Sequence, residues 1–277
     1  MKVCVVGAGT MGRDIAQVFA QKERYTTLLC SSTAASANAG KDKIAAKLFS
    51  RVEKGKMEQG EAERILNAIH ITELTGCADC DLIIEAIPED MGQKKALFSR
   101  LTGICREDCI FASDTSSLSI TELAVGIKQP VIGMHFFNPA TVMKLVEISP
   151  GLNTPPEIVR IISDIAVDVG KTPVEVKENA GFLVNRMLIP MINEAIGLYA
   201  EGVASVEGID TAMRLGANHP MGPLALGDMI GLDVCLAIME VIHAESGDNK
   251  YRPHPLLRKM VRGGHLGVKT GIGFYKY

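Results

Sequence analysis

A glycine fingerprint close to the amino terminus restricts the possible folds more than any other part of this chain. Residues 7–12 read Gly-Ala-Gly-Thr-Met-Gly, between a strand-like apolar run, 2–6, and a run with helical apolar spacing, 11–21. In such a unit the first glycine permits a tight turn, the second lets the backbone approach a pyrophosphate, and the third lets helix and strand pack closely. Amides at the helix start then bind phosphate oxygens. The residues predicted to hold a dinucleotide are Gly7, Gly9, Thr10, Met11 and Gly12.

Strand and helix patterns alternate after the fingerprint. Short apolar runs predict strands at 2–6, 26–30, 69–72, 82–86, 110–112, 131–135, 144–148 and 174–176. Apolar residues at helical spacing predict helices at 11–21, 34–54, 61–67, 93–104 and 154–168. This alternation is typical of an α/β fold, and we expect a Rossmann-like, doubly wound, mostly parallel sheet.

The pattern changes near residues 177–181, after which no strand is expected. Helices are predicted at 182–201, 206–215, 223–244 and 255–262, separated by segments with glycine and proline. A length of 277 residues is sufficient for two domains, each with its own core. We therefore expect a dinucleotide-binding domain over 1–180 and an all-α domain over 181–277.

The composition is that of an ordinary globular protein and argues against several functional classes. Hydrophobic residues make up 47% of the chain and charged residues 22%, and the net charge of −3 implies no general attraction to nucleic acid. No apolar run is long enough to span a bilayer, and the amino terminus enters a strand pattern without the features of a signal peptide. We expect a cytoplasmic protein that binds neither membrane nor nucleic acid.

Seven cysteines are scattered through the predicted strands and helices, and this odd number favours reduced thiols over a disulfide framework. Cys77 and Cys80 have the CxxC spacing of some zinc and redox sites. A zinc site needs further ligands, and the sequence has no second CxxC and no HxxxH pattern. We interpret the two residues as incidental thiols and expect no metal.

One histidine and one carboxylate, His135 and Glu147, lie twelve residues apart in neighbouring strand-like runs. A histidine exchanges a proton near neutral pH, and a carboxylate beside it selects its tautomer and stabilises its charged form. A single histidine in apolar surroundings is more often a hydrogen-bonded structural residue. Together with a dinucleotide site, however, the pair suits hydride transfer from an alcohol with one general base.

Longer segments carry a more specific signal than these short patterns. They read DLIIEAIPED, SDTSSLSITELA, HFFNPA followed by MKLVE, GFLVNRMLIPMINEA, GIDTAMRLGANHPMGPLALGD and GVKTGIGFYKY. In this order, nearly end to end, they resemble the 3-hydroxyacyl-CoA dehydrogenases, including short-chain 3-hydroxybutyryl-CoA dehydrogenases. The resemblance implies reversible oxidation of an (S)-3-hydroxyacyl-CoA, with 3-hydroxybutyryl-CoA and acetoacetyl-CoA as the main pair, in butyrate or fatty-acid metabolism. It also implies that His135 is the acid/base, that Glu147 orients it, and that the helical domain forms a homodimer.

The resemblance assigns further roles to residues whose spacing alone suggests simpler ones. Ser116 matches a residue that touches cofactor and substrate, and Asn185 one that holds the substrate oxygen; alone they suggest a helix cap and an interhelical hydrogen bond. Lys47 and Lys54, on one face of a predicted helix, match the helix that meets coenzyme A, with a solvated basic face as the alternative. The remaining residues implied to contact the cofactor are Glu89, Lys94, Asn138 and Lys269. Without the resemblance, Glu89 and Lys94 would suggest a solvated helix start.

Two positions depart from the resembled pattern. Asp114 stands where the family commonly has asparagine, so we expect different hydrogen bonding there. The second predicted strand ends at Cys30, and Ser31 follows it at a position where a ribose-binding carboxylate usually sits. Without that carboxylate, NAD loses an acceptor for its ribose hydroxyls and the 2′-phosphate of NADP loses a repulsion, while Arg13 or Arg24 could lie near. We expect NAD(H) or NADP(H) as the cofactor, with the choice between them open.

Two other functions are compatible with parts of the sequence. A dehydrogenase of free 3-hydroxy acids would use a lysine on the interdomain helix, where this chain has Asn185 and Arg186. A nucleotide-binding scaffold or sensor would not need an acid/base pair, yet His135 and Glu147 are both present. Turnover of acetoacetyl-CoA with each reduced coenzyme distinguishes the three functions.

Overall fold

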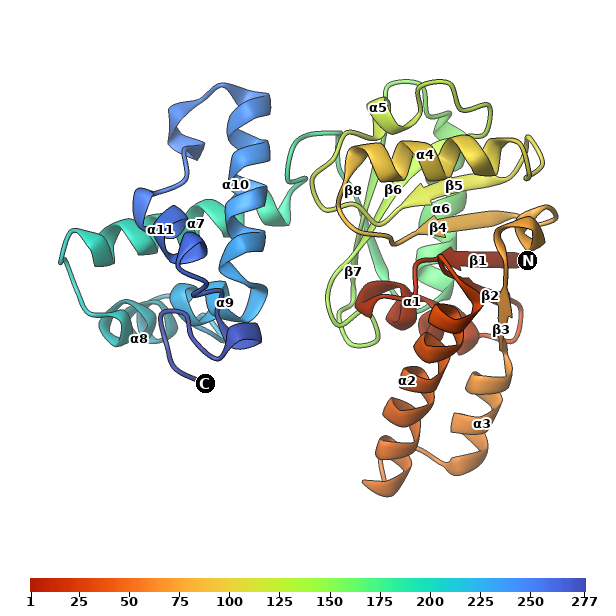
Figure 1. The fold of residues 1–277 in the computed structure, drawn as a ribbon, viewed down its shortest axis with the longest axis horizontal. Helices are drawn as coiled ribbons and strands as arrows, with labels where there is room; N and C mark the ends of the chain where they lie inside the picture. Colours follow the sequence, from red (N-terminus) through yellow and green to blue (C-terminus); the bar gives the residue numbers. More distant parts are fainter. The chain divides into compact units, whose positions relative to one another are not determined.

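The protein is described over residues 1–277 by a computed structural model. The chain divides into two compact units, Met1–Glu178 and Asn179–Tyr277. The first unit contains a sheet with helices on its faces, and the second contains helices and short turns (Figure 1).

Eight strands form the sheet of the first unit, in the order β3-β2-β1-β4-β5-β6-β7-β8. All neighbours are parallel except β6 and β7. The strand order reverses between β1 and β4, and open α/β sheets bind ligands beyond the carboxyl ends of the strands at such a point. The strands are β1 (Lys2–Val6), β2 (Thr26–Cys30), β3 (Ile69–Thr72), β4 (Leu82–Glu85), β5 (Ile110–Ser113), β6 (Val131–Phe136), β7 (Leu145–Pro150) and β8 (Thr172–Glu175). The predicted doubly wound, mostly parallel sheet is confirmed.

Helices cover both faces of this sheet, with α4 on one side and α6 on the other (Figure 1). On the α4 side, the ring of Phe98 packs 5.3 Å from the ring of Phe111 in β5. The helices of this unit are α1 (Thr10–Ala20), α2 (Ala34–Glu53), α3 (Gln59–Asn67), α4 (Met91–Thr102), α5 (Ile120–Leu123) and α6 (Pro156–Asp168), with a 3₁₀ turn η1 (Leu74–Cys77).

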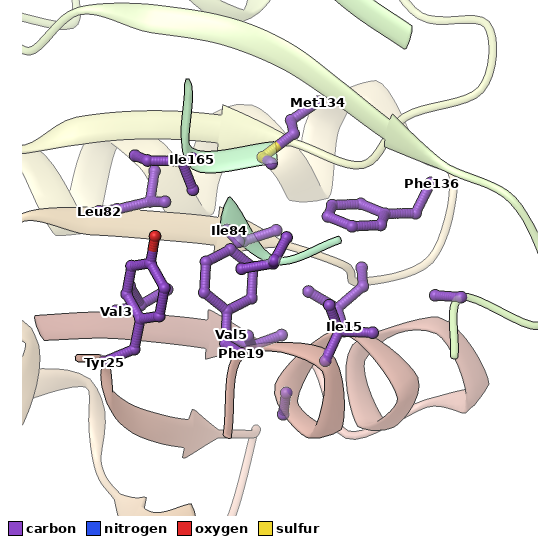
Figure 2. Close-up of a cluster of buried hydrophobic side chains, with 14 of the residues drawn as sticks. Val3, Val5, Ile15, Phe19, Tyr25, Leu82, Ile84, Met134, Phe136 and Ile165 are labelled. Carbon is purple, nitrogen blue, oxygen red and sulfur yellow. The ribbon is translucent and has the colours of Figure 1, made fainter. Parts of the chain in front are cut away.

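The main core lies on the face of the sheet that α1 and α6 cover. Alternate residues of a strand point to the same face, so one set from each of the strands β1 to β7 enters this core. Figure 2 shows these side chains converging from β1, β4, β6, α1 and α6. The labelled members are Val3, Val5, Ile15, Phe19, Tyr25, Leu82, Ile84, Met134, Phe136 and Ile165. Burial of this apolar surface holds the carboxyl ends of the central strands in place.

The second unit packs five helices around a core of its own. Buried Asp228 ties the chain terminus to this core, since its carboxylate accepts from the backbone N–H of Phe274 at 3.0 Å and of Tyr275 at 2.9 Å. No helix in either unit combines the length and the apolar character needed to cross a membrane. The elements are α7 (Val184–Ala200), α8 (Val206–Gly216), α9 (Pro223–Ile230), α10 (Leu232–Ser246), α11 (Pro255–Arg262), η2 (Asn249–Tyr251) and η3 (Val268–Thr270).

The structure corrects three expectations about helices. The single helix predicted over 223–244 is wrong, because Gly231 has φ +104° and separates α9 from α10. The helix predicted from residue 154 begins at Pro156, where proline is compatible with the first helical turn. The short helix α5 was not predicted, since four residues are too few to show a helical period.

All seven cysteines are buried free thiols. Cys77 lies in η1, and its Sγ atom is 3.4 Å from that of Cys4 in β1. No three histidine, cysteine or carboxylate side chains are grouped so that they could hold a metal ion.

Candidate active site

The glycine turn between β1 and α1 is closely packed on its protein side and open at its centre. Gly7 has φ +122°, and a Cβ there would lie 2.3 Å from the carbonyl oxygen of Ala86. A Cβ on Gly12 would lie 1.8 Å from the carbonyl oxygen of Gly7, whereas one on Gly9 would have no neighbour within 4 Å. Side chains are thus excluded at the first and third glycines, and the second leaves room for a ligand to approach the backbone.

The amino end of α1 fits a phosphate group. Gly9 is the N-cap residue, no side chain caps the first amides, and the first turn contains no acidic residue. These amides and the positive end of the helix dipole suit an anionic ligand. Arg13 stabilises the turn, with Nη1 donating to the Ala8 carbonyl at 3.2 Å and Nη2 to Thr10 Oγ1 at 3.4 Å. The residues present therefore fit the pyrophosphate of a dinucleotide.

Ser31 follows β2 directly, at the carboxyl edge of the sheet, and is partly exposed. Its hydroxyl lies 3.0 Å from the hydroxyl of Ser36 in α2. Two uncharged hydroxyl groups therefore occupy the position where related folds have a ribose-binding carboxylate. The expectation that Arg24 could lie near this position is wrong. Arg24 precedes β2, at the opposite end of the strand, and its Nη1 lies 3.3 Å from Asp168 Oδ1.

His135 in β6 and Glu147 in β7 form a buried pair. The two residues are directly opposite in the antiparallel register, and His135 Nδ1 lies 2.8 Å from Glu147 Oε2. The side chains are only 8% and 0% exposed, so little water competes for this contact. A carboxylate beside Nδ1 favours the tautomer that carries its proton on Nδ1, and in that tautomer Nε2 is the acceptor atom of the ring. The Phe137 ring lies 4.5 Å from the imidazole.

One lysine binds the loop that joins β6 and β7. The Lys171 ammonium donates to the carbonyls of Ala140 and, at 2.8 Å, Met143. Burial lowers the pKa of Lys171, and nearby Lys144 adds to this effect. Asn138 is exposed in the same loop, two residues after β6 ends, so its amide is available to a ligand.

Glu89 organises the loop that carries Ser116. Its Oε1 atom accepts from Thr115 Oγ1 at 2.7 Å, from Ser116 N at 2.9 Å and from Ser116 Oγ at 3.1 Å. The Glu89 side chain is 37% exposed, and its partial burial opposes ionisation, but Lys94 and these hydrogen bonds outweigh this effect and hold the pKa of Glu89 below its usual value. The helix-cap alternative for Ser116 is wrong, because Ser119 caps α5 by accepting from Glu122 N.

Lys94 is buried, contrary to the alternative of a solvated helix start. Its side chain is 1% exposed, and Nζ lies 2.6 Å from Glu85 Oε1 and 3.3 Å from Glu89 Oε2. Glu85, at the end of β4, is fully buried and also accepts from Ser113 Oγ at 2.6 Å. Glu85 was not predicted as a site residue, and its only signal in the sequence was a carboxylate at the end of an otherwise apolar strand.

Comparison with known proteins decides the family. Residues 2–179 match the 3-hydroxyacyl-CoA dehydrogenase NAD binding domain, and residues 181–277 match the 3-hydroxyacyl-CoA dehydrogenase C-terminal domain. The chain belongs to the 3-hydroxyacyl-CoA dehydrogenase family. The resemblance seen in the sequence is therefore confirmed.

Relatives of known name match this family member over essentially their whole length. A 3-hydroxybutyryl-CoA dehydrogenase of Clostridioides difficile is 52% identical, over 100% of this chain and 99% of the relative. A probable 3-hydroxybutyryl-CoA dehydrogenase of Bacillus subtilis is 50% identical, over 100% of this chain and 97% of the relative. The crystal structure of (S)-3-hydroxybutyryl-CoA dehydrogenase from Ralstonia eutropha superposes with a TM-score of 0.94 at 43% identity, covering 100% of this chain and 98% of that one.

Lys47 in α2 and Lys54, which follows it, are placed differently in this 3-hydroxyacyl-CoA dehydrogenase. Lys47 is 42% exposed, and its Nζ lies 2.7 Å from Oδ1 of buried Asp14 in α1 and 3.2 Å from Thr141 Oγ1. Lys54 is the exposed C-cap residue of the helix. The structure thus ties Lys47 to α1 and to the loop after β6, and leaves Lys54 facing solvent. Asp14 was missed in the sequence, because its burial depends on packing.

Asn185 and Lys269 belong to the helical unit. Asn185 lies in the first turn of α7, and Lys269 lies in η3 with its Nζ 2.6 Å from Asp233 Oδ2. Lys269 therefore has an acidic partner within its own unit. Within the first unit, the structure gathers the glycine turn, Ser31, the Glu89 cluster and the His135–Glu147 pair at the carboxyl ends of the strands.

Proposed function

We propose that this protein interconverts (S)-3-hydroxybutyryl-CoA and acetoacetyl-CoA by hydride transfer with a nicotinamide coenzyme. The observation that carries the proposal is the buried 2.8 Å contact between His135 and Glu147, in a chain that matches both domains of the family. The names of these relatives support short-chain substrates over other 3-hydroxyacyl-CoA thioesters.

The coenzyme is proposed to lie across the carboxyl edge of the sheet. When bound, its nicotinamide ring supplies the acceptor or the donor of the hydride. The amides of Gly9, Thr10 and Met11, beside the packing contacts of Gly7 and Gly12, bind the pyrophosphate. Ser31 binds the ribose next to the adenine. The residues proposed to face the nicotinamide half are Glu89, Lys94, Ser116 and Asn138, with Lys269 as a further contact.

His135 is proposed to move the proton. In the oxidising direction Nε2 takes the proton of the substrate hydroxyl, and in the reducing direction the imidazolium returns it. Glu147 keeps the proton of the neutral ring on Nδ1 and stabilises the positive charge that forms. Because both side chains are buried, this stabilisation is stronger than it would be in water.

The substrate is proposed to meet four further side chains. The Ser116 hydroxyl and the Asn185 amide donate to the substrate oxygen, where negative charge develops during the reaction. Lys54 pairs with a phosphate of coenzyme A, and Lys47 assists from the middle of α2, where its contact with Asp14 fixes its position. The two residues are seven apart in sequence, and this spacing puts their positions on one side of the helix, as an extended phosphate-rich ligand requires.

The helical unit is proposed to form a homodimer. It exposes large apolar side chains, with Met187 71%, Leu215 79% and Val203 64% accessible. Single exposed apolar residues are ordinary, but several on one small unit favour burial against a second copy. Sedimentation equilibrium of the purified protein measures this directly.

One assay tests the proposed reaction. Acetoacetyl-CoA is mixed with the enzyme and either NADH or NADPH, and oxidation of the coenzyme is followed at its absorbance maximum. We expect turnover that depends on acetoacetyl-CoA and forms the (S)-alcohol. Free acetoacetate serves as the control substrate, and faster turnover with it would favour the alternative of a free-acid dehydrogenase.

A further inference from the structure

Asp114 lies between the cluster around Glu89 and the strand that carries His135. β5 pairs with β6 only as far as Ser113 opposite Gly133, while β6 continues to Phe136. The Asp114 carboxylate continues the pairing beyond this point, because its Oδ1 accepts from the backbone N–H of Phe136 at 2.8 Å. This amide belongs to the residue directly after His135. A side-chain oxygen thus takes the place of a backbone carbonyl beside the proton-transfer residue.

The backbone of Asp114 is also hydrogen-bonded, to β4. Its backbone N–H donates to the carbonyl of Glu85 at 2.8 Å. Its neighbours in the chain bind the same acidic cluster, Ser113 through Glu85 and Thr115 through Glu89. Asp114 therefore joins the loop that carries Ser116 to the strand that carries His135.

The charges around Asp114 are unbalanced. Glu85 at the end of β4 and Glu89 after it are acidic, Lys94 of α4 is the one cation beside them, and the His135–Glu147 pair lies on the β6 side. Burial raises the pKa of Asp114 well above its ordinary value, and Glu85 and Glu89 add to this, while the Phe136 N–H and Lys94 oppose it. An ionised Asp114 would leave three carboxylates around a single lysine.

We propose that Asp114 is a positioning residue for His135, and that its carboxyl group takes up and releases a proton within the working pH range of the enzyme. Both the neutral and the ionised carboxyl group present an oxygen to the Phe136 N–H, so the position of the strand does not depend on pH. The charge does depend on pH. Once ionised, Asp114 favours the imidazolium form of His135. The acid needed for reduction then persists to higher pH, at the expense of the base needed for oxidation.

The inference rests on the proposed function. It has an electrostatic part, the charge of Asp114, and a positioning part, the hydrogen bond to Phe136, and the substitution Asp114→Asn separates the two. Asparagine has the same shape and can still accept from Phe136 N–H, but it carries no charge. We expect the midpoint of the pH–rate profile for 3-hydroxybutyryl-CoA oxidation to move down by about half a pH unit, as for the loss of one charge that does not touch the imidazole and is partly screened. Turnover at the plateau should fall by no more than about threefold, since the hydrogen bond remains.

Asp114→Ala removes the hydrogen bond as well, and we expect turnover at every pH to fall by about tenfold or more. Asp164→Asn is the matched control, because Asp164 is exposed on α6, and its profile should match that of the parent. Superimposable profiles for the parent and Asp114→Asn would overturn the electrostatic part. Full turnover in Asp114→Ala would overturn the positioning part.

A second measurement does not depend on turnover. Carbon-13 NMR of protein labelled at the aspartate carboxyl carbons follows each ionisation, and Asp114→Asn identifies the resonance of Asp114. We expect this resonance to titrate at a pH well above the other aspartates. If the Asp114 resonance titrated in the same pH range as the resonances of exposed aspartates, the inference would be overturned. An inactive parent with the expected titration would instead contradict the proposed function and leave the ionisation of Asp114 established.

Discussion

His135 and Glu147 face each other across the antiparallel pair β6 and β7, with Nδ1 of the histidine 2.8 Å from Oε2 of the glutamate. Directly opposite residues in such a pair have their Cβ atoms about 5 Å apart, which is the right separation for this contact. The two residues are twelve positions apart in sequence, within one strand–loop–strand unit. The register of two strands therefore places the proposed acid/base pair.

Replacing the proposed base should abolish most of the activity. For His135→Gln we expect turnover to fall on the order of a hundredfold to ten-thousandfold, because the proton has no acceptor in the transition state. The melting temperature and the affinity for coenzyme should stay close to those of the parent. His70→Gln is the control, since His70 is exposed in β3. Near-parental turnover in His135→Gln would show that another group moves the proton.

Glu147→Gln tests the role of the charge in the pair. Glutamine keeps the size of the side chain but removes the negative charge that favours imidazolium. We expect a large fall in turnover, and a pH–rate profile for alcohol oxidation whose midpoint moves to lower pH. The double variant with His135→Gln should lose little more than His135→Gln alone, because the two residues act as a unit. An unchanged profile would make Glu147 merely structural.

Coenzyme selection should respond to a single charge at Ser31. The parent is expected to use NADPH at a rate comparable to or better than NADH, because no carboxylate there repels the 2′-phosphate. Ser31→Asp should shift the ratio of kcat/KM toward NADH by roughly tenfold to a few hundredfold. Ser99→Asp, at an exposed position of α4, controls for added charge alone. A parent with strong NADH preference that Ser31→Asp does not alter would mean that another segment binds the ribose.

Lys94 should contribute strongly to stability through its buried contact with Glu85. Lys94→Met leaves the Glu85 carboxylate without its cation in a fully buried position, which typically costs about 3–5 kcal/mol. Lys95→Met, next in the same helix, removes only an exposed pair with Glu122 and should cost less than about 1 kcal/mol. Urea unfolding of both variants measures the difference. Equal stabilities would show that Glu85 gains enough from its other hydrogen bonds.

Lys54 should affect binding of the nucleotide part of the substrate rather than the chemical step. Lys54→Ala is expected to raise KM for acetoacetyl-CoA by about threefold to tenfold with little change in kcat, as for one partly screened phosphate contact. Acetoacetyl-pantetheine lacks the nucleotide and is the matched control substrate. If KM rises equally for both substrates, Lys54 does not meet the phosphates.

Local patterns in the sequence were sufficient for the fold of the first unit and for the core of its site. The glycine turn is a local device, because Gly7 and Gly12 are required by contacts within one strand–turn–helix unit. Each strand is also visible in the sequence as a short apolar run, so all eight were predicted to within a few residues. His135 and Glu147 could be paired from the sequence because their strands follow one another.

Only the tertiary structure decided which charges are buried and what they bind. Lys94 reads as an ordinary residue of a helix start, yet β4 and α4 together enclose it with Glu85. Glu89 holds the Ser116 loop, which follows β5, and Asp14 meets Lys47 across two helices. The Glu89–Ser116 and Asp14–Lys47 partners are 27 and 33 residues apart and become neighbours only when parallel strands assemble through crossover helices. Local periodicity in the sequence determines the helices and strands, whereas burial and charge pairing depend on which of these elements become neighbours.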